Sequence, residues 1–444
     1  MQYRNDTVTI KRNLKESSRP LFFILMIMAC GLSGHQAVAI DDVYPSYSFN
    51  GFATLGAVYS DEDQADFVSS WLLQPNGAGS TSEWHAGVDT KLGGQLDIQF
   101  NPAFSAVLQV VVQRQEDNAW TPEIEWANIK YQFNDNLSLR LGRTVLQTFM
   151  VSDTRLVGYA NPWIRGPQEV YQLNPLTNFD GLDLTYSQEF DSGRNIMQLN
   201  IGQSNRDIIR DGQIRARNGL VLINTFEVDF ATLRLMYMRA KLDLSIEQSD
   251  LAFDAYATLG EALSLIPGQE ANAAQARAIS TRYLVEDAPT ELYSVGIKLE
   301  PGNWLLMGEW GRVTETGALA SVTAGYTTLA YHFAELMPFL TLAEVNGDTP
   351  NEPGLSTTGM PPPLATEVNQ LNQGLNTLLL QASAAQKSIT AGLRWDFHPG
   401  AALKLQYQHI DIDKQSPGRL GNVQPGFSPG GTVNVFSTAI DLVF

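Results

Sequence analysis

Hydrophobic and polar residues alternate along most of this chain from about residue 47 onward. The clearest example is 88–100, with apolar Val88, Leu92, Leu96, Ile98 and Phe100 on one parity and polar Asp89, Lys91, Gln95, Asp97 and Gln99 on the other. Alternation of this kind places the two sets on opposite faces of a β-strand. Asn101-Pro102 marks a tight turn, after which a second alternating stretch begins. The pattern therefore predicts antiparallel strands joined by hairpins.

The same unit recurs sixteen times. The predicted strands cover 47–59, 84–100, 104–115, 124–133, 137–144, 181–190, 195–203, 219–230, 232–242, 291–300, 303–313, 322–333, 338–346, 387–397, 401–410 and 432–444. An even number of up-and-down strands allows the first and last to meet, which closure of a barrel requires. The fold class predicted is all-β, a 16-stranded antiparallel transmembrane β-barrel.

Connections between these strands are sorted by length. The short ones are 101–102, 134–136, 191–193, 231, 301–302, 335–336 and 399–400, and the long ones lie near 60–83, 116–122, 145–179, 204–218, 243–289, 314–320, 348–386 and 411–431. Outer-membrane barrels have short turns at one end and long loops at the other. Aromatic residues cluster beside the short turns, as in the girdles of such barrels: Phe100, Phe104, Phe133, Phe190, Phe230, Trp304, Phe333, Phe339 and Phe397.

The long connection 145–179 follows the fifth predicted strand and has no helical or strand period. A structureless segment of this length inside a compact fold is usually functional. We expect it to fold into the bore and set its width. Its candidate constriction residues are Arg143 at its start and Asp153, Arg155, Arg165 and Glu169 within it. Opposed charges across a narrow bore discriminate among ions, although the same charges could instead pair to pin the loop to the wall.

Further charged residues have polar-face parity on the predicted strands. Facing lipid, a mid-depth Lys or Arg would cost roughly 2–4 kcal/mol, so these side chains are expected to line the pore. The candidate pore-wall residues are Asp89, Lys91, Arg140, Arg394 and Lys404.

Two of the long loops carry helical patterns. Residues 250–282 are rich in Ala and Leu with a break at Pro267-Gly268, and 364–378 repeat Leu or Val every three to four residues after three prolines. These helices could cap the mouth, enter the lumen or form a subunit contact. The bulk of loops 243–289 and 348–386 keeps open a second hypothesis, a closed or plugged barrel that acts as a surface binder or structural anchor.

The N-terminal segment has the features of a signal peptide. A basic start precedes the apolar run 21–32, and Ala37-Val38-Ala39 forms a cleavage site. The predicted division is a signal peptide at 1–39 and a barrel at 40–444. Cys30 loosely matches a lipoprotein box, so lipidation there is the alternative to cleavage after Ala39.

Charge and motifs narrow the function further. The net charge is −18, and removal of 1–39, with its five basic and two acidic residues, takes it to −21. This argues against binding of nucleic acid and favours a mild preference for cations. The sequence has no motif for a catalytic triad, a metal site or a phosphate-binding loop, so no enzyme activity, metal or cofactor is expected.

Taken together, the signal segment, the sixteen strands, the sorted loops and a last strand ending at Phe444 resemble Gram-negative outer-membrane porins. The chain is similar to porin-like proteins of marine and environmental bacteria. The resemblance implies a multi-pass protein of the cell outer membrane, with a water-filled channel for passive diffusion of small hydrophilic solutes or ions. It also implies a homotrimer, contact with outer-membrane lipid and lipopolysaccharide, and recognition of the last strand by the barrel-assembly machinery.

In general porins the longest inward loop follows the fifth strand, which is the position of 145–179 here. The loop sequence departs from the family pattern, because 160–169 reads ANPWIRGPQE where enterobacterial porins carry a short Pro-Glu-Phe-Gly form. The resemblance therefore implies an inward loop without specifying its constriction geometry.

Overall fold

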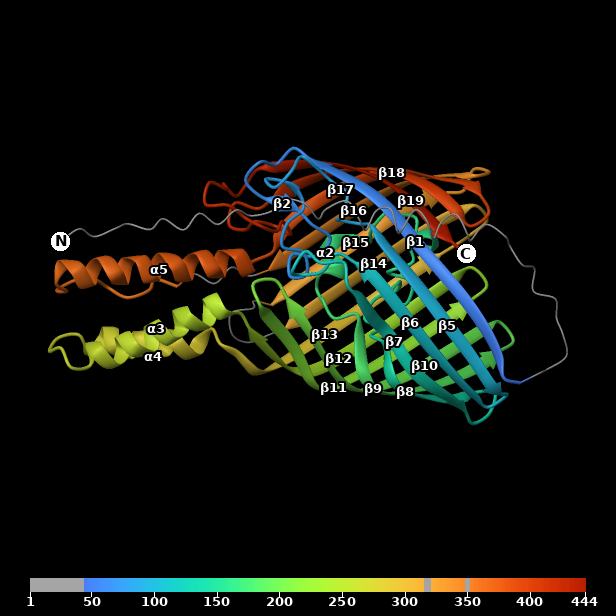
Figure 1. The fold of residues 1–444 in the computed structure, drawn as a ribbon, viewed down its shortest axis with the longest axis horizontal. Helices are drawn as coiled ribbons and strands as arrows, with labels where there is room; N and C mark the ends of the chain where they lie inside the picture. The colour runs from blue at the N-terminus through green and yellow to red at the C-terminus, as the bar shows by residue number, and fades with distance from the viewer. Residues whose placement is uncertain (1–43, 315–320, 348–351) are drawn as a thin grey trace, which may run out of the picture. The chain divides into compact units, whose positions relative to one another are not determined.

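A computed structural model of the chain describes residues 44–314, 321–347 and 352–444. Sixteen long strands in this part form one antiparallel sheet. The sheet closes on itself because β1 pairs with β5 along 46–54 and with β19 along 52–60. The predicted closed barrel is confirmed (Figure 1).

Each predicted strand overlaps one long strand of the barrel, but the predicted strand 84–100 begins too early, because its long strand covers only Lys91–Asn101. The long strands are β1 (Ser46–Ser60), β5 (Lys91–Asn101), β6 (Phe104–Gln113), β7 (Pro122–Gln132), β8 (Leu137–Val145), β9 (Asn178–Phe190), β10 (Gly193–Ile208), β11 (Gly212–Val228), β12 (Ala231–Ser245), β13 (Val285–Leu299), β14 (Trp304–Thr314), β15 (Val322–Tyr331), β16 (Leu336–Gly347), β17 (Ala385–His398), β18 (Ala401–Ile412) and β19 (Thr432–Val443). The first long loop adds three two-residue strands, β2 (Asp66–Phe67), β3 (Ala78–Gly79) and β4 (Trp84–His85).

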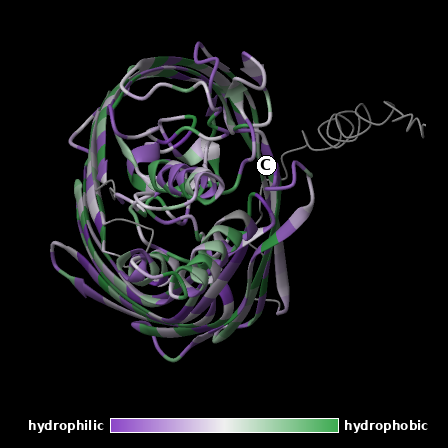
Figure 2. Ribbon diagram, turned by 90° about the vertical axis from the view of Figure 1, so that its left-hand side faces the viewer, coloured by the Kyte–Doolittle hydropathy of each residue, from purple (hydrophilic) through white to green (hydrophobic). Residues whose placement is uncertain are grey.

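The two faces of the sheet differ in chemistry, as β18 illustrates. Lys404 and Gln406 point inward and are buried, whereas Leu405 and Tyr407 point outward and are exposed. The same outward exposure of apolar side chains recurs around the ring at Ile129, Leu141, Ile201, Leu222, Leu235, Val295, Leu340 and Ile389. Figure 2 shows hydrophobic and hydrophilic segments alternating along the strands. An apolar outside around a polar inside suits a lipid environment.

Aromatic rings stack on one another at the short-turn end. Phe104 lies 4.8 Å from Tyr131, which in turn lies 4.8 Å from Phe133. Farther around the same end, Trp304 of β14 lies 4.7 Å from Tyr331 of the adjacent β15. These contacts between ring centroids form part of the predicted girdle, and amphipathic rings of this kind favour the lipid–water boundary.

Phe339 is an exception among the residues predicted for that girdle. It shares the parity of inward-facing Thr341 and is only 5% exposed. Its ring covers Gly392, where an added Cβ would come within 2.2 Å of the ring. The prediction that Phe339 belongs to the outer girdle was therefore wrong. Strand parity, and not proximity to a short turn, decides which side of the sheet a residue occupies.

The predicted long connection 204–218 is also wrong. β10 and β11 continue through most of this segment and meet at a tight turn, 209–211. Arg217 of β11 forms ion pairs with Asp243 on the neighbouring β12 at 2.7 Å and with Asp287 on β13, one strand farther along, at 3.2 Å. Charged cross-strand pairs of this kind stabilise a sheet where apolar residues do not alternate. The strands predicted from hydrophobic alternation were therefore shorter than β10 and β11.

Both predicted helical loops contain helices, namely α3 (Glu247–Leu263), α4 (Glu270–Arg282) and α5 (Pro362–Ala382). They pack on one another through a shared apolar core, made by Tyr256, Leu263, Ile279, Val368, Leu375 and Leu379 among others. The helices connect strands at the long-loop end (Figure 1). Among the described residues, no helix combines the length and apolarity that crossing a membrane requires.

Glu352 joins the two helical loops. Its carboxylate is nearly inaccessible and accepts hydrogen bonds from Gln275 at 2.8 Å and Tyr283 at 2.9 Å. Arg282 completes the group with an ion pair of 2.5 Å. These contacts hold the start of the α5 loop against α4.

The predicted signal peptide lies outside the described residues. Cleavage after Ala39 and lipidation of Cys30 therefore stay sequence-based alternatives.

Candidate functional site

The connection between β8 and β9, residues 146–177, passes through the interior of the barrel; we call it the crossing loop (Figure 1). It contains a 3₁₀ turn, Gly158–Ala160, and the short helix α2 (Gln168–Tyr171). β8 and β16 lie on opposite sides of the closed ring. The loop accepts hydrogen bonds from Arg234 of β12 and Ser294 of β13, and it also contacts inward-facing side chains of β14 to β19.

Trp163 attaches the crossing loop to the far wall. Its indole Nε1 donates to the hydroxyls of Thr328 at 3.1 Å and Thr341 at 3.0 Å, on β15 and β16. The ring packs edge-on against Tyr326, with centroids 5.6 Å apart. The side chain is 1% exposed. A large aromatic group in a fully packed position anchors a loop through both its area and its N–H.

Lys404 is a second attachment point. Its ammonium group donates to the carbonyl oxygens of Gly158, Asn161 and Trp163 at 2.7, 2.7 and 2.8 Å, and it pairs with Asp441 at 2.8 Å. Both charged side chains are fully buried. Burying a charge is costly unless it is paired and hydrogen-bonded, and here the loop backbone supplies the remaining partners.

Arg394 holds the same turn from β17. Its guanidinium donates to the carbonyl oxygens of Tyr159 at 2.7 Å and Asn161 at 3.2 Å, and it lies 4.7 Å from the Tyr159 ring centroid. Asp396 pairs with it at 2.7 Å. Two predicted wall cations, Lys404 and Arg394, are therefore engaged by the crossing loop.

Arg165 of the crossing loop and Asp89 of the wall form a buried ion pair. Arg165 Nε donates to Asp89 Oδ1 at 2.8 Å, and its Nη2 contacts the other carboxylate oxygen and Ser437 Oγ, the latter at 2.9 Å. The guanidinium also stacks over Phe67, 4.9 Å from the ring centroid. A bidentate contact of this kind fixes orientation as well as charge.

Glu169 is fully buried at the start of α2. Its Oε1 accepts a hydrogen bond of 2.7 Å from Gln386 of β17. The Glu169 carboxylate also attracts Arg419 from the last long loop, where burial lowers the pKa of Arg419 to about 10. For both Arg165 and Glu169, the contacts seen are those of anchoring to the wall.

Glu309 is a wall residue that the sequence interpretation missed. It accepts hydrogen bonds from Tyr171 at 2.5 Å, Tyr326 at 2.7 Å and the Met150 backbone N–H at 2.9 Å. Asp441 was missed as well. Both have inward parity between apolar outward neighbours, so strand parity alone could have found them.

Three other candidate residues do not join these contacts. Arg140 pairs with Asp183 at 2.7 Å on the near wall. Arg143 pairs with Asp180 at 2.8 Å, and both side chains are well exposed, at 36% and 48%. Asp153 is an exposed carboxylate on the crossing loop.

Two further loops pack beside the crossing loop. The first long loop contacts α2, because Gln168 donates to the Val68 carbonyl and Gln172 donates to the Ser69 carbonyl at 2.9 Å. The last long loop joins it through Asp66, which accepts a hydrogen bond of 2.7 Å from Asn422. Three loops therefore meet inside the long-loop end of the barrel.

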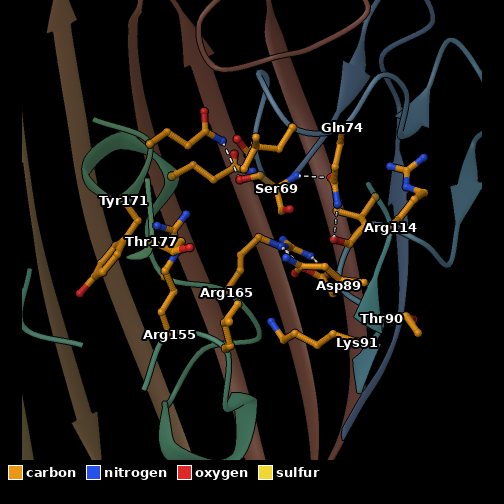
Figure 3. Close-up of a pocket in the computed structure, with 18 of the residues that line it drawn as sticks. Ser69, Gln74, Asp89, Thr90, Lys91, Arg114, Arg155, Arg165, Tyr171 and Thr177 are labelled. Atoms are coloured by element: carbon orange, nitrogen blue, oxygen red, sulfur yellow. Dashed lines mark hydrogen bonds and ion pairs between the residues drawn. The ribbon is translucent and has the colours of Figure 1, made fainter. Parts of the chain in front are cut away.

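A pocket of about 90 Å³ remains between the crossing loop, residues 69–74 and strands β5 and β6; we call it the loop pocket (Figure 3). Figure 3 shows Arg155, Arg165 and Lys91 extending into the same region from the loop and from β5. Arg114 and Arg206 also line it, and the sequence interpretation missed both.

Among residues 44–314, 321–347 and 352–444, no group of three His, Cys, Asp or Glu side chains is arranged to hold a metal ion.

No protein-family model and no curated protein sequence matches this chain. Solved structures do. A Salmonella typhi OmpF structure aligns with 13% identity and a TM-score of 0.52, covering 90% of this chain and 97% of OmpF. The outer-membrane channel DcaP of Acinetobacter baumannii aligns with 11% identity and a TM-score of 0.50, covering 90% and 97%. At these identities the likeness establishes the fold.

The closed sixteen-stranded sheet, its apolar outer face and its sorted loops agree with that likeness. This chain therefore has the fold of a porin-like, sixteen-stranded antiparallel β-barrel.

Proposed function

We propose that the protein forms a channel for passive diffusion of small hydrophilic solutes or ions, and that the crossing loop constricts it. The observation that carries this proposal is the attachment of the loop to the far wall at Lys404, Arg394 and Trp163. A segment held across a barrel leaves only the space beside it for passage. Since two other loops pack against this segment, we expect a narrow channel.

A second candidate, the plugged barrel, is favoured by the apolar packing inside the long-loop half. Phe149 and Leu146 of the crossing loop share one buried cluster with Ile223, Met236 and Leu292 of the inner wall. An apolar cluster excludes water. If it extends across the whole bore, the protein serves as a surface binder or structural anchor.

Conductance separates the two candidates. Purified protein reconstituted in a planar bilayer should produce stepwise current increments if it is a channel. Reproducible silence over many insertions, with correct folding verified by resistance to unheated detergent, would contradict the channel and support the plugged barrel.

Replacing Gly158 with alanine tests whether the crossing loop sets the conductance. The added Cβ would stand 2.1 Å from Asp441 Oδ1 and 2.7 Å from Thr54 Oγ1, so the loop must move away from the wall. Overpacking of this kind typically costs about 1–3 kcal/mol. We expect a larger or noisier single-channel conductance than in the wild type.

Gly374→Ala in α5 is the matched control, because a Cβ there meets nothing within 4 Å. It should conduct like the wild type. Identical conductance for wild type, Gly158→Ala and Gly374→Ala would argue against a constriction by the crossing loop.

We further propose that the protein is a homotrimer in contact with outer-membrane lipid and lipopolysaccharide, inserted by the barrel-assembly machinery. The outward apolar side chains support contact with lipid. The mass of the protein in detergent, measured by light scattering with the detergent contribution subtracted, tests the trimer, and a monomeric mass would refute it.

A further inference from the structure

The charges around the loop pocket do not cancel. One carboxylate lines it, that of Asp89, and Arg165 already pairs with it. Arg206 pairs with Glu123 at 3.3 Å. The basic side chains lining the pocket are Lys91, Arg114, Arg155, Arg165 and Arg206.

Three of these cations have no carboxylate partner among the described residues. Arg114 is held by neutral groups, donating to the side-chain and backbone oxygens of Asn76. The side chains of Lys91 and Arg155 form no hydrogen bond or ion pair within the part of the chain that the structure describes. Positive groups so placed repel one another, and the site is more stable when an anion is present.

Acidic groups attract these three cations without pairing with them. Asp89 and Asp441 attract Lys91, Glu125 attracts Arg155 and Asp66 attracts Arg114, but none of these carboxylates forms an ion pair with the cation that it attracts. Asp441 instead pairs with Lys404. Arg114 lies outside the membrane-spanning strands, and burial lowers its pKa to about 10, so it is still positively charged at neutral pH.

The pocket is small. Its volume of about 90 Å³ has room for a few groups of the size of water. That suits a compact oxyanion such as phosphate or the carboxylate of a small organic acid, and is too little for a sugar ring.

We propose that the loop pocket is an oxyanion-binding subsite, formed by Lys91 and Arg155 with Arg114 and Arg206 around them, and that it makes the channel prefer anions. The selectivity rests on the proposed channel function, whereas binding does not. Charge-assisted hydrogen bonds from ammonium and guanidinium groups supply the recognition. This reverses the cation preference expected from the net charge.

Binding is tested with inorganic phosphate by titration calorimetry on the detergent-solubilised full-length barrel. The variant is Lys91→Gln/Arg155→Gln, which removes two cations that hold no other group in the described structure. Since a hydrogen bond to a charged group contributes about 1.5–3 kcal/mol, the variant should bind phosphate about tenfold more weakly or worse.

The control is Lys298→Gln/Lys387→Gln, which removes the same charge from a partly exposed pair with Glu300 and an exposed pair with Glu344, away from the pocket. It should bind phosphate like the wild type. Absence of phosphate binding by the wild type, or equal weakening in both double variants, would overturn the proposal.

Selectivity is tested by the reversal potential in a potassium chloride gradient. Wild type should show anion preference, the Lys91→Gln/Arg155→Gln variant should move toward cations, and added phosphate should reduce the chloride current of wild type only. A conducting, cation-selective protein that binds no phosphate would refute the subsite and leave the channel function intact. A silent barrel that binds phosphate in the pocket would refute the channel and leave the subsite intact.

Discussion

Replacing Lys404 with methionine should lower the free energy of unfolding by about 3–5 kcal/mol, the range found when one partner of a buried ion pair is removed. Methionine has a similar length but leaves the Asp441 carboxylate without its cation in a fully buried site. It also removes the donor shared by the carbonyls of Gly158, Asn161 and Trp163. Urea unfolding of the protein in phospholipid vesicles measures the effect.

Two variants make the Lys404→Met result specific. Lys298→Met breaks a partly exposed pair with Glu300 on the same inner face and should cost no more than about 1 kcal/mol. Lys404→Met/Asp441→Leu removes both buried charges and should recover most of the loss, because an apolar pair avoids desolvation of a lone carboxylate. A Lys404→Met variant as stable as Lys298→Met would contradict the anchoring role of Lys404.

Trp163→Ala should also destabilise the protein by about 3–5 kcal/mol, as large-to-small changes of buried aromatic residues do. The indole fills a site that is 1% exposed and packs against Tyr326. The Thr328 and Thr341 hydroxyls keep each other as partners at 2.7 Å, so most of the cost comes from the lost packing. If the variant releases the crossing loop, the free energy of unfolding should fall and the single-channel conductance should change in the same variant.

Trp163→Phe is the matched variant, because it keeps an aromatic ring and removes the N–H donor. It should retain more stability than Trp163→Ala and a conductance closer to that of the wild type. If the two variants were equally destabilised, the hydrogen bonds to Thr328 and Thr341, and not the packing of the ring, would be the main contribution of Trp163.

The strands and their closure could be predicted because they depend on a local pattern. Alternation at period 2 is visible within a few residues, and an outward Leu405 beside an inward Lys404 needs no distant partner to be assigned a face. The prediction failed where this pattern was interrupted. The extensions of β10 and β11 are stabilised by charged cross-strand pairs such as Arg217 with Asp243, which hydrophobic alternation does not detect.

The pairing of charged residues could not be predicted in the same way. Asp89 and Arg165 were both candidates, yet nothing local indicates that these side chains, 76 positions apart, form one ion pair. Lys404 reaches the Gly158 carbonyl across 246 positions. Parity identifies which residues face inward, but only the path of the crossing loop decides which of them meet.

Sequence alone determined the barrel, the order of its strands and the loop that enters it, because each follows from periodicity and connection length. Tertiary structure decided which candidate charges anchor that loop and which line the loop pocket. It also changed the expected ion preference. Net charge adds groups over the whole chain, whereas a solute responds to charges within about 8 Å at physiological salt, and around the loop pocket the uncompensated groups are Lys91, Arg114 and Arg155.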